Sequence, residues 1–302
     1  MNRLTLNLTA LVLLLLIGTG TCIAALSDDQ RAIIDQITGA KGSYTPAEDV
    51  HRVTFPRTDV KVQVDGWTMD PFMGLTSWAA FTSADPEQAM VMGDLTLFED
   101  EVNPVLTVLL NNGLEVTAIH NHFFFDQPRV MFMHIGGTGS VEKLATGVRG
   151  AIDKVREIRQ AKTQPQDSFA GMAIPEKSSI TSGPIESILG AKGQANAGMY
   201  KVSLGRNATA HGHPIGNQMG VNTWAAFAGS DESAFVDGDF AMLKSEVQKV
   251  LKSLSRSGIN IVALHNHMTQ EEPQYIFLHY WGKGRAADLA KAVKAALDPQ
   301  SK

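Results

Sequence analysis

The feature that most constrains the fold is an internal repeat, because the second half of the chain copies the first at an offset of 145 residues. The repeat carries a histidine trio: His120, His122 and His134 recur as His265, His267 and His279. Trp78 to Phe81 recur as Trp224 to Phe227, at an offset of 146 residues. Two long copies indicate a duplicated domain, since solenoid repeats are shorter and more numerous. We expect the two copies to pack about a pseudo-twofold axis.

Hydrophobic periodicity predicts the same order of elements in both copies. In the first copy it predicts strands over 76–81, 89–97, 114–122 and 129–135, and helices over 99–112 and 141–152. An additional helix over 28–37 is expected to lead this copy, with 187–189 as its counterpart in the second. The predicted fold class is therefore α+β, a tandem duplicated β-β-α-β-β-α domain with pseudo-twofold symmetry.

Four segments are expected along the chain. They are a signal peptide over 1–25, a first repeat domain over 26–159, a linker over 160–177 and a second repeat domain over 178–302. The signal interpretation rests on Arg3, the apolar run over 11–17 and small residues before a cleavage point after Ala24 or Ala25. An apolar run of this length is shorter than the ~20 residues of a membrane-spanning helix.

A cleaved signal predicts a periplasmic or secreted protein without a transmembrane domain. An uncleaved anchor is the alternative, and lipidation of Cys22 ranks second because Thr19 stands where a lipoprotein signal has a leucine-type residue. Cys22 is the only cysteine, so the mature chain would have neither a disulfide nor a thiolate ligand. A net charge of −5 without a Lys/Arg cluster argues against nucleic-acid binding.

The histidine trio lies on two predicted strands joined by a short turn around 126–128. Side chains alternate along a strand, which places Leu114, Val116, Ala118, His120 and His122 on one face. A hairpin would then set His120 opposite His134 and His122 opposite Phe132. The trio predicts a metal site in each copy, because imidazole is a common metal ligand. The alternative is that each histidine simply bonds to backbone or water.

Three imidazoles without a thiolate predict a divalent transition metal, with zinc ranked first and copper or iron next. Three histidines leave an open coordination position, as catalytic zinc sites do. The candidate general bases are Glu271 and Asp126, which occupy equivalent turn positions in the two copies.

Other recurring residues are weaker candidates. Asp94 and Asp239 follow a glycine in a predicted strand, and they could mark a bulge or orient an imidazole. Trp78 and Trp224 are expected in the core. We expect the His211-Gly212-His213 segment to form a loop rather than an accessory metal site.

Taken together, these motifs resemble the LppY/LpqO family of secreted bacterial proteins. The resemblance rests on the signal, on Ser77 to Phe81, and on the histidine trio with its partners in the second copy. It covers nearly the whole mature chain and implies export and duplication. Many members of that family are lipoproteins, from which this chain departs at residues 19–22.

Three functions follow from these patterns. The leading hypothesis is an exported transition-metal-binding protein with a His₃ site in each repeat, serving metal sequestration or delivery. The second is a metal-dependent hydrolase or lyase that uses a metal-activated water. The third is a metal-free module in which the histidines line a pocket for a small molecule.

Overall fold

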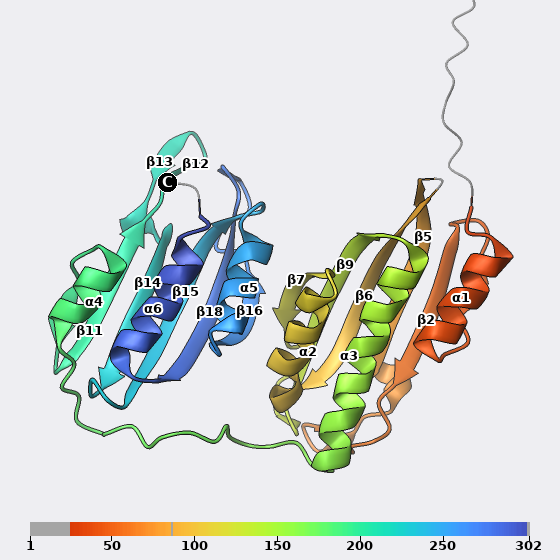
Figure 1. Cartoon of the computed structure of the whole chain (residues 1–302), viewed down its shortest axis with the longest axis horizontal. Helices are drawn as coiled ribbons and strands as arrows, with labels where there is room; N and C mark the ends of the chain where they lie inside the picture. Colours follow the sequence, from red (N-terminus) through yellow and green to blue (C-terminus); the bar gives the residue numbers. More distant parts are fainter. Residues whose placement is uncertain (1–24, 86, 301–302) are drawn as a thin grey trace, which may run out of the picture.

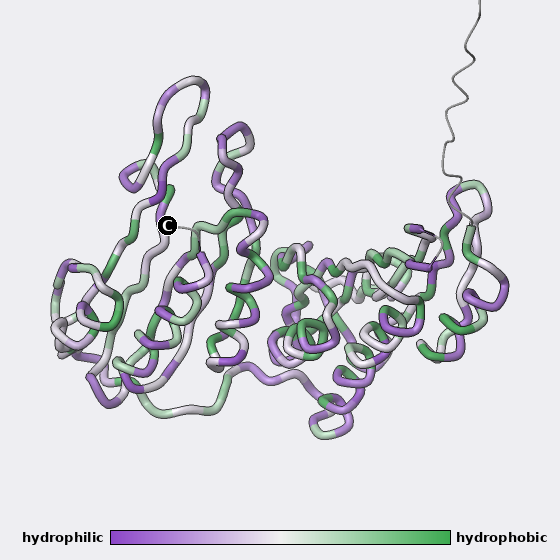
Figure 2. The backbone as a smooth tube through the Cα atoms, turned by 45° about the horizontal axis from the view of Figure 1, so that its top comes forward, coloured by the Kyte–Doolittle hydropathy of each residue, from purple (hydrophilic) through white to green (hydrophobic). Residues whose placement is uncertain are grey.

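The computed structural model describes residues 25–85 and 87–300. It shows two halves of similar design, each with three helices on one face of its strands (Figure 1). We call α1 to α3 with their strands repeat one, and α4 to α6 with theirs repeat two. Along the helices hydrophobic and hydrophilic residues alternate, as Figure 2 shows, which gives each helix an apolar stripe to lay against the sheet.

Repeat one contains the helices α1 (Asp28–Thr38), α2 (Glu99–Asn111) and α3 (Val141–Ala161). Its strands are β1 (Ser43–Thr45), β2 (Val50–Pro56), β3 (Gln63–Val64), β4 (Trp67–Thr68), β5 (Thr76–Asp85), β6 (Gln88–Phe98), β7 (Glu115–His120), β8 (Asp126–Gln127) and β9 (Val130–Gly139). A 3₁₀ turn, η1 (Pro71–Met73), precedes β5.

Repeat two contains the helices α4 (Ser182–Leu189), α5 (Val247–Arg256) and α6 (Ala286–Leu297). Its strands are β10 (Gln194–Asn196), β11 (Met199–Gly205), β12 (Ala208–Ala210), β13 (His213–Ile215), β14 (Asn222–Gly229), β15 (Ala234–Leu243), β16 (Asn260–His265), β17 (Glu271–Glu272) and β18 (Tyr275–Gly284). The 3₁₀ turn η2 (Asn217–Met219) corresponds to η1.

The long strands of both repeats form one twelve-stranded sheet in the order β1-β2-β5-β6-β9-β7-β16-β18-β15-β14-β11-β10. This order is the same when read from either edge with the repeats exchanged, so the pseudo-twofold axis passes between β7 and β16. The two central strands pair antiparallel at Ile119 and Leu264. The α+β class, the duplicated β-β-α-β-β-α unit and the pseudo-twofold symmetry are confirmed.

A reciprocal pair of side-chain amides joins the repeats beside these central strands. Asn103 on α2 accepts from the Ile261 N–H at 2.8 Å and donates to the Ile261 carbonyl at 3.2 Å. Its symmetry counterpart Gln248, on α5, accepts from the Val116 N–H at 3.1 Å and donates to the Val116 carbonyl at 2.8 Å. Each side-chain amide therefore makes the two hydrogen bonds that a neighbouring strand would otherwise make with a main-chain N–H and carbonyl of the other repeat.

The groups that these amides bind belong to β-bulges. In β7 the pairing with β9 shifts between Val116 and Ala118, and in β16 the pairing with β18 shifts between Ile261 and Ala263. An extra residue in one strand of an antiparallel pair changes which face the following side chains occupy. Val116 and Ile119 accordingly both pack in the core beneath the helices, although their spacing in the sequence is odd.

Because of this bulge, the residues before and after it in β7 do not share one face as predicted. Leu114 and Val116 face the helices, whereas Ala118 and His120 lie on the opposite face, which we call the open face. The register also differs, because His120 pairs with Phe132 and Ala118 pairs with His134. The expected shared apolar face was wrong, since period-two alternation cannot anticipate an inserted residue.

Small three-stranded sheets cover part of the open face. In repeat one they follow the order β4-β3-β8, and in repeat two β13-β12-β17. A separate apolar cluster beneath the first includes Val62, Phe98 and Phe132, and a matching cluster beneath the second includes Val221 and Phe277. The His211-Gly212 pair forms the turn between β12 and β13, as expected of a loop.

Several predicted boundaries differ from the structure or fall outside it. Helix α3 ends at Ala161, two residues into the predicted linker, and residues 162–181 contain only an isolated bridge between Ser179 and Ser230. The predicted signal and Cys22 lie outside the described residues, apart from Ala25. Among the described residues, no helix has the length and apolarity to span a membrane.

We call the reciprocal side-chain amides of Asn103 and Gln248 the amide clamp, and we predict that this clamp stabilises the joined sheet. Asn103→Ala and Gln248→Ala should each lower the free energy of unfolding by about 1–3 kcal/mol, because each removes both partners of a buried main-chain pair. Urea unfolding measures the loss. The control is Gln88→Ala, which removes an exposed amide at the start of β6. Clamp variants as stable as the control would show that the amides do not hold the repeats together.

Candidate metal centre

Strand pairing brings each histidine trio together on the open face. His120 ends β7 and His265 ends β16, while His134 and His279 lie within the neighbouring strands β9 and β18. Ala118 lies opposite His134, and Ala263 lies opposite His279, so a small residue separates each strand histidine from the centre of the sheet. His122 and His267 follow the ends of β7 and β16 and turn back over the sheet.

The imidazoles of repeat one form a stacked group. The Nε2 atoms of His120 and His122 are 3.2 Å apart. The rings of His120 and His134 are parallel within 1°, with centroids 5.1 Å apart. His122 in turn stacks on Phe132 at 3.4 Å between centroids. The two rings are in contact although the predicted strand pairing of His122 with Phe132 was wrong, because Phe132 pairs with His120.

In repeat two a carboxylate joins the histidines. Asp239, His265 and His267 each offer one ligand atom, and these three atoms lie within 4.8 Å of one another. Asp239 Oδ2 is 3.2 Å from His267 Nε2. The other carboxylate oxygen accepts the Leu278 N–H at 3.1 Å, which holds the side chain in place. Asp239 is 2% exposed, so an uncompensated negative charge here would be unfavourable.

His279 takes a different position from the other two histidines of its trio. Its ring stacks on His265 at 4.5 Å between centroids, and it is exposed. It does not belong to the Asp239, His265 and His267 group. Strand pairing nevertheless places it directly opposite Asp239.

Asp94 is the counterpart of Asp239 in repeat one. It pairs with His134 on β9 and with Trp78 on β5. Its Oδ1 atom is buried without a hydrogen-bond partner among the described residues, and so is Nδ1 of His265. Buried polar atoms left without partners are uncommon in native proteins and often mark an ion or water position. Of the two interpretations of the repeated aspartates, a role beside the imidazoles fits this geometry.

Partial burial favours the neutral, metal-binding form of three of these histidines by lowering their pKa. Partial burial lowers the pKa of His120, with repulsion from His122 and His134 adding to the effect. It also lowers the pKa of His122 and of His265, while Asp94 and Asp239 oppose the respective shifts. Because a metal ligand must be deprotonated, this environment favours metal binding down to a lower pH than free histidine would allow.

The two proposed general bases are held by main-chain hydrogen bonds. Asp126 Oδ2 accepts the Val130 N–H at 2.6 Å, and Glu271 Oε1 accepts the Tyr275 N–H at 3.1 Å. Both side chains are buried. Glu271 retains one buried oxygen, Oε2, without a partner among the described residues. A catalytic role for either carboxylate stays a prediction.

The two tryptophans lie on the open face rather than in the core. Trp78 pairs with Asp94, and Trp224 pairs with Asp239. Both are partly buried, and each ring is covered by a cation, with Arg52 at 4.2 Å from Trp78 and Lys201 at 3.9 Å from Trp224. The expectation that these rings pack in the core was wrong, since the alternation of β5 and β14 turns them toward the side of the carboxylates.

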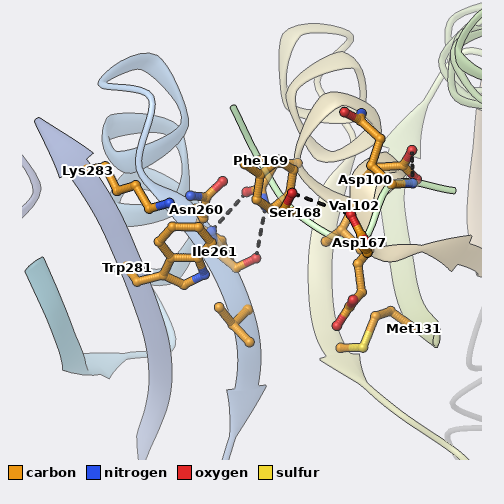
Figure 3. A pocket seen from close by; sticks show the side chains of 14 residues that line it. Asp100, Val102, Met131, Asp167, Ser168, Phe169, Asn260, Ile261, Trp281 and Lys283 are labelled. Atoms are coloured by element: carbon orange, nitrogen blue, oxygen red, sulfur yellow. Dashed lines mark hydrogen bonds between the residues drawn. The ribbon is translucent and has the colours of Figure 1, made fainter. Parts of the chain in front are cut away.

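A cavity of about 300 Å³ lies at the junction of the repeats, and none of the histidines lines it. Figure 3 shows Trp281 and Lys283 on one side of it and Asp167 and Met131 on the other. The connecting segment crosses here: Phe169 lies 5.7 Å from Trp281 between ring centroids, and the Gln166 N–H donates to Asp100 at 3.2 Å. The histidine sites therefore lie outside the cavity at the junction.

Comparison with known proteins gives a family for this chain. A family model described as Domain of Unknown Function (DUF1259) matches residues 32–154 and again 183–299. The chain belongs to this family. The double match agrees with the tandem duplication. No curated protein matches the chain significantly. Among solved structures, the trimeric bacterial microcompartment shell protein PduB matches at 12% identity, over 85% of this chain and 89% of that one, with a TM-score of 0.19. A score this low supports no inference.

We predict that the metal-free protein loses stability as the pH falls below the ordinary histidine value of about 6.5. The folded state lowers the pKa of His120, His122 and His265, so in this range the unfolded chain binds more protons and is favoured. Urea unfolding at a series of pH values, with an NMR titration of the imidazole protons, measures both effects. Histidine midpoints at or above 6.5 would contradict this account of the site.

Proposed function

We propose that this protein is a transition-metal-binding protein with one site in each repeat, serving metal sequestration or delivery. The observation that carries the proposal is the convergence of Asp239, His265 and His267, whose ligand atoms lie within 4.8 Å of one another. Atoms bound to one ion at about 2.0–2.1 Å can be at most about 4.2 Å apart. Closing this group around an ion therefore requires movements of less than about 1 Å.

The donor set fits a divalent transition metal. Nitrogen with one carboxylate oxygen suits zinc first, and copper or iron next, whereas calcium and magnesium prefer oxygen ligands alone. In repeat one the corresponding ligands are His120, His122 and Asp94, with His134 stacked beside them. His134 and His279 stack on His120 and His265 beside these sets, and we propose them as additional ligands.

The geometry favours two separate sites over one dinuclear centre. His134 and His279 lie on β9 and β18, with β7 and β16 between them. Strands β9 and β18 are three strand spacings of about 4.8 Å apart, so His134 and His279 are separated by about 14 Å across the sheet. Metal ions that share a reaction are about 3.5–4 Å apart. Two independent sites on one face suit metal storage or transfer.

Partial exposure also supports binding and release. The side chain of His267 is 31% exposed, while the side chain of its partner Asp239 is 3% exposed. One ligand can therefore leave toward solvent while a fixed carboxylate remains behind. The hydrolase or lyase alternative needs a base aimed at a metal-bound water. Because Asp126 and Glu271 already bind main-chain N–H groups, we rank that alternative second and the metal-free module third.

The proposal includes export of the protein from the cytoplasm. The apolar N-terminal segment supports a periplasmic or secreted location, with a lipid anchor at Cys22 as the alternative. The same motifs support a place in the LppY/LpqO group. An oxidising compartment suits metal ligands of this kind, because imidazole and carboxylate do not oxidise to disulfides as thiolates do.

Metal content tests the proposal. Plasma mass spectrometry on purified protein without an affinity tag should find up to two equivalents of metal. His265→Ala should remove one equivalent, and His120→Ala/His265→Ala should remove both. The matched control is His211→Ala/His213→Ala, which deletes two histidines from the β12–β13 hairpin and should leave the content unchanged. Absence of metal from the wild type, even after incubation with zinc and copper, would refute the proposal.

Two further substitutions separate ligands from structural carboxylates. Asp239→Asn should weaken metal binding in repeat two by at least about tenfold, because it removes a charged ligand. Glu271→Gln keeps the carbonyl oxygen that accepts the Tyr275 N–H, so it should leave the affinity within about twofold. Competition with a chelator measures both affinities. A larger loss from Glu271→Gln than from Asp239→Asn would assign the fixed ligand to Glu271 instead.

A further inference from the structure

A second candidate site lies on the helical side of the sheet, away from the histidines. A cavity of about 690 Å³ opens between α3, the segment after α1, and the strands β2, β5 and β6. Cavities of about 300–1,000 Å³ commonly accommodate small organic ligands. None of the histidines lines this cavity. We call it the repeat-one cleft.

One wall of the repeat-one cleft is apolar. Leu95 and Leu97 come from β6, and Ile152 and Val155 come from α3. All four side chains are buried within the main core, with relative exposures of 8% or less. A ligand that fits here must present an apolar body, because burying a polar group against such a wall without a hydrogen bond is unfavourable.

The charged residues that line the cleft are mostly cationic. Arg57, Arg156 and Arg159 line it together with a single acidic residue, Asp59, although the whole chain carries a net charge of −5. Arg156 is the accessible member, with its side chain 50% exposed and its Nη1 atom 3.2 Å from Asp153, which does not line the cleft. Although each of these arginines also contacts a carboxylate, three guanidinium groups give the cleft N–H donors suited to an anion.

The two deeper arginines are held in place by carboxylates. Arg57 donates to both oxygens of Glu101, at 2.7 and 3.0 Å. Arg159 is 6% exposed and is paired with Asp100 and Glu101. Its Nη1 atom is buried and has no hydrogen-bond partner among the described residues. A buried guanidinium N–H without a partner is a donor that an anionic head group could satisfy.

Repeat two offers a comparison within the same chain. A cavity of about 590 Å³ occupies the equivalent place, and Arg206 lines it where Arg57 lines the first. Gln300 takes the place of Arg159, since its Nε2 donates to the Ala241 carbonyl at 2.9 Å and lies 3.4 Å from Glu246. The repeat-two cavity is also lined by Lys294 and Asp298, so it has two cationic residues beside one acid where the repeat-one cleft has three.

We propose that the repeat-one cleft binds a small organic anion with an apolar body, such as a medium-chain or aryl carboxylate. The head group lies toward Arg156 and Arg159, and the apolar body lies along Leu95, Leu97 and Ile152. This site is independent of the proposed metal sites, because it lies on the opposite face of the sheet.

Calorimetric titration of the full protein with three probes of equal chain length tests the class of ligand. Octanoate should bind with one equivalent, while 1-octanol and octyltrimethylammonium should bind at least about tenfold more weakly, since they cannot pair with a guanidinium. Equal affinity for the three probes, or no binding of octanoate, would overturn the proposal. Prior loading with zinc should leave the octanoate affinity within twofold, whether or not the metal sites exist.

Substitutions on α3 test the location. Arg156→Glu should weaken octanoate binding by about tenfold or more, by removing one ion pair and adding repulsion. The matched control is Lys154→Glu, the same charge change on the same helix outside the cleft. Ile152→Trp, which fills the cleft, should abolish binding in a protein whose circular dichroism remains that of wild type. Wild-type affinity in Arg156→Glu or in a folded Ile152→Trp variant would place the ligand elsewhere and refute the site.

Discussion

A single inserted residue in each central strand determines both how the repeats join and where the histidines point. Without the bulge between Val116 and Ala118, His120 would lie on the same face as Val116, in the core beneath the helices. The bulge turns His120 to the open face. Beside the bulge, Gln248 of the other repeat binds the Val116 N–H and carbonyl.

The joint then sets the arrangement of the two sites. Because β7 and β16 pair antiparallel, both histidine trios face the same side of one sheet and run in opposite directions. His120 and His265 end the two adjacent central strands, but each trio extends outward from there to its own strand, His134 on β9 and His279 on β18, so the trios diverge instead of facing each other. The small side chains of Ala118 and Ala263 lie next to the strand histidines, which leaves the imidazoles free to stack on one another.

On the helical face of the sheet, both repeats contain the same buried ion pair. In each repeat a buried glutamate at the start of the helix after the second long hairpin strand pairs with an arginine, as Glu101 does with Arg57 and Glu246 with Arg206. An ion pair of this kind is destabilising to break, since it would leave a buried charge uncompensated. The repeats differ in the second side chain that contacts this glutamate, which is Arg159 in repeat one and Gln300 in repeat two. The same ion pair is therefore kept in both repeats, while the change from Gln300 to Arg159 adds a guanidinium group to the repeat-one cleft.

The sequence by itself determined the duplication, the order of the central strands and helices of each repeat, and the residues that form each histidine trio, because periodicity and repeated spacing are local properties of the chain. It did not predict the outer strands β2 and β11 of the main sheet. Only the tertiary structure decided the register, the face of each strand and the position of Asp94 and Asp239 beside the histidines. These depend on a bulge and on pairing between segments far apart in the chain, as with Asp239 and His267 or Asn103 and Ile261. An inserted residue reverses every later side chain of a strand, and no local pattern of hydrophobicity records it.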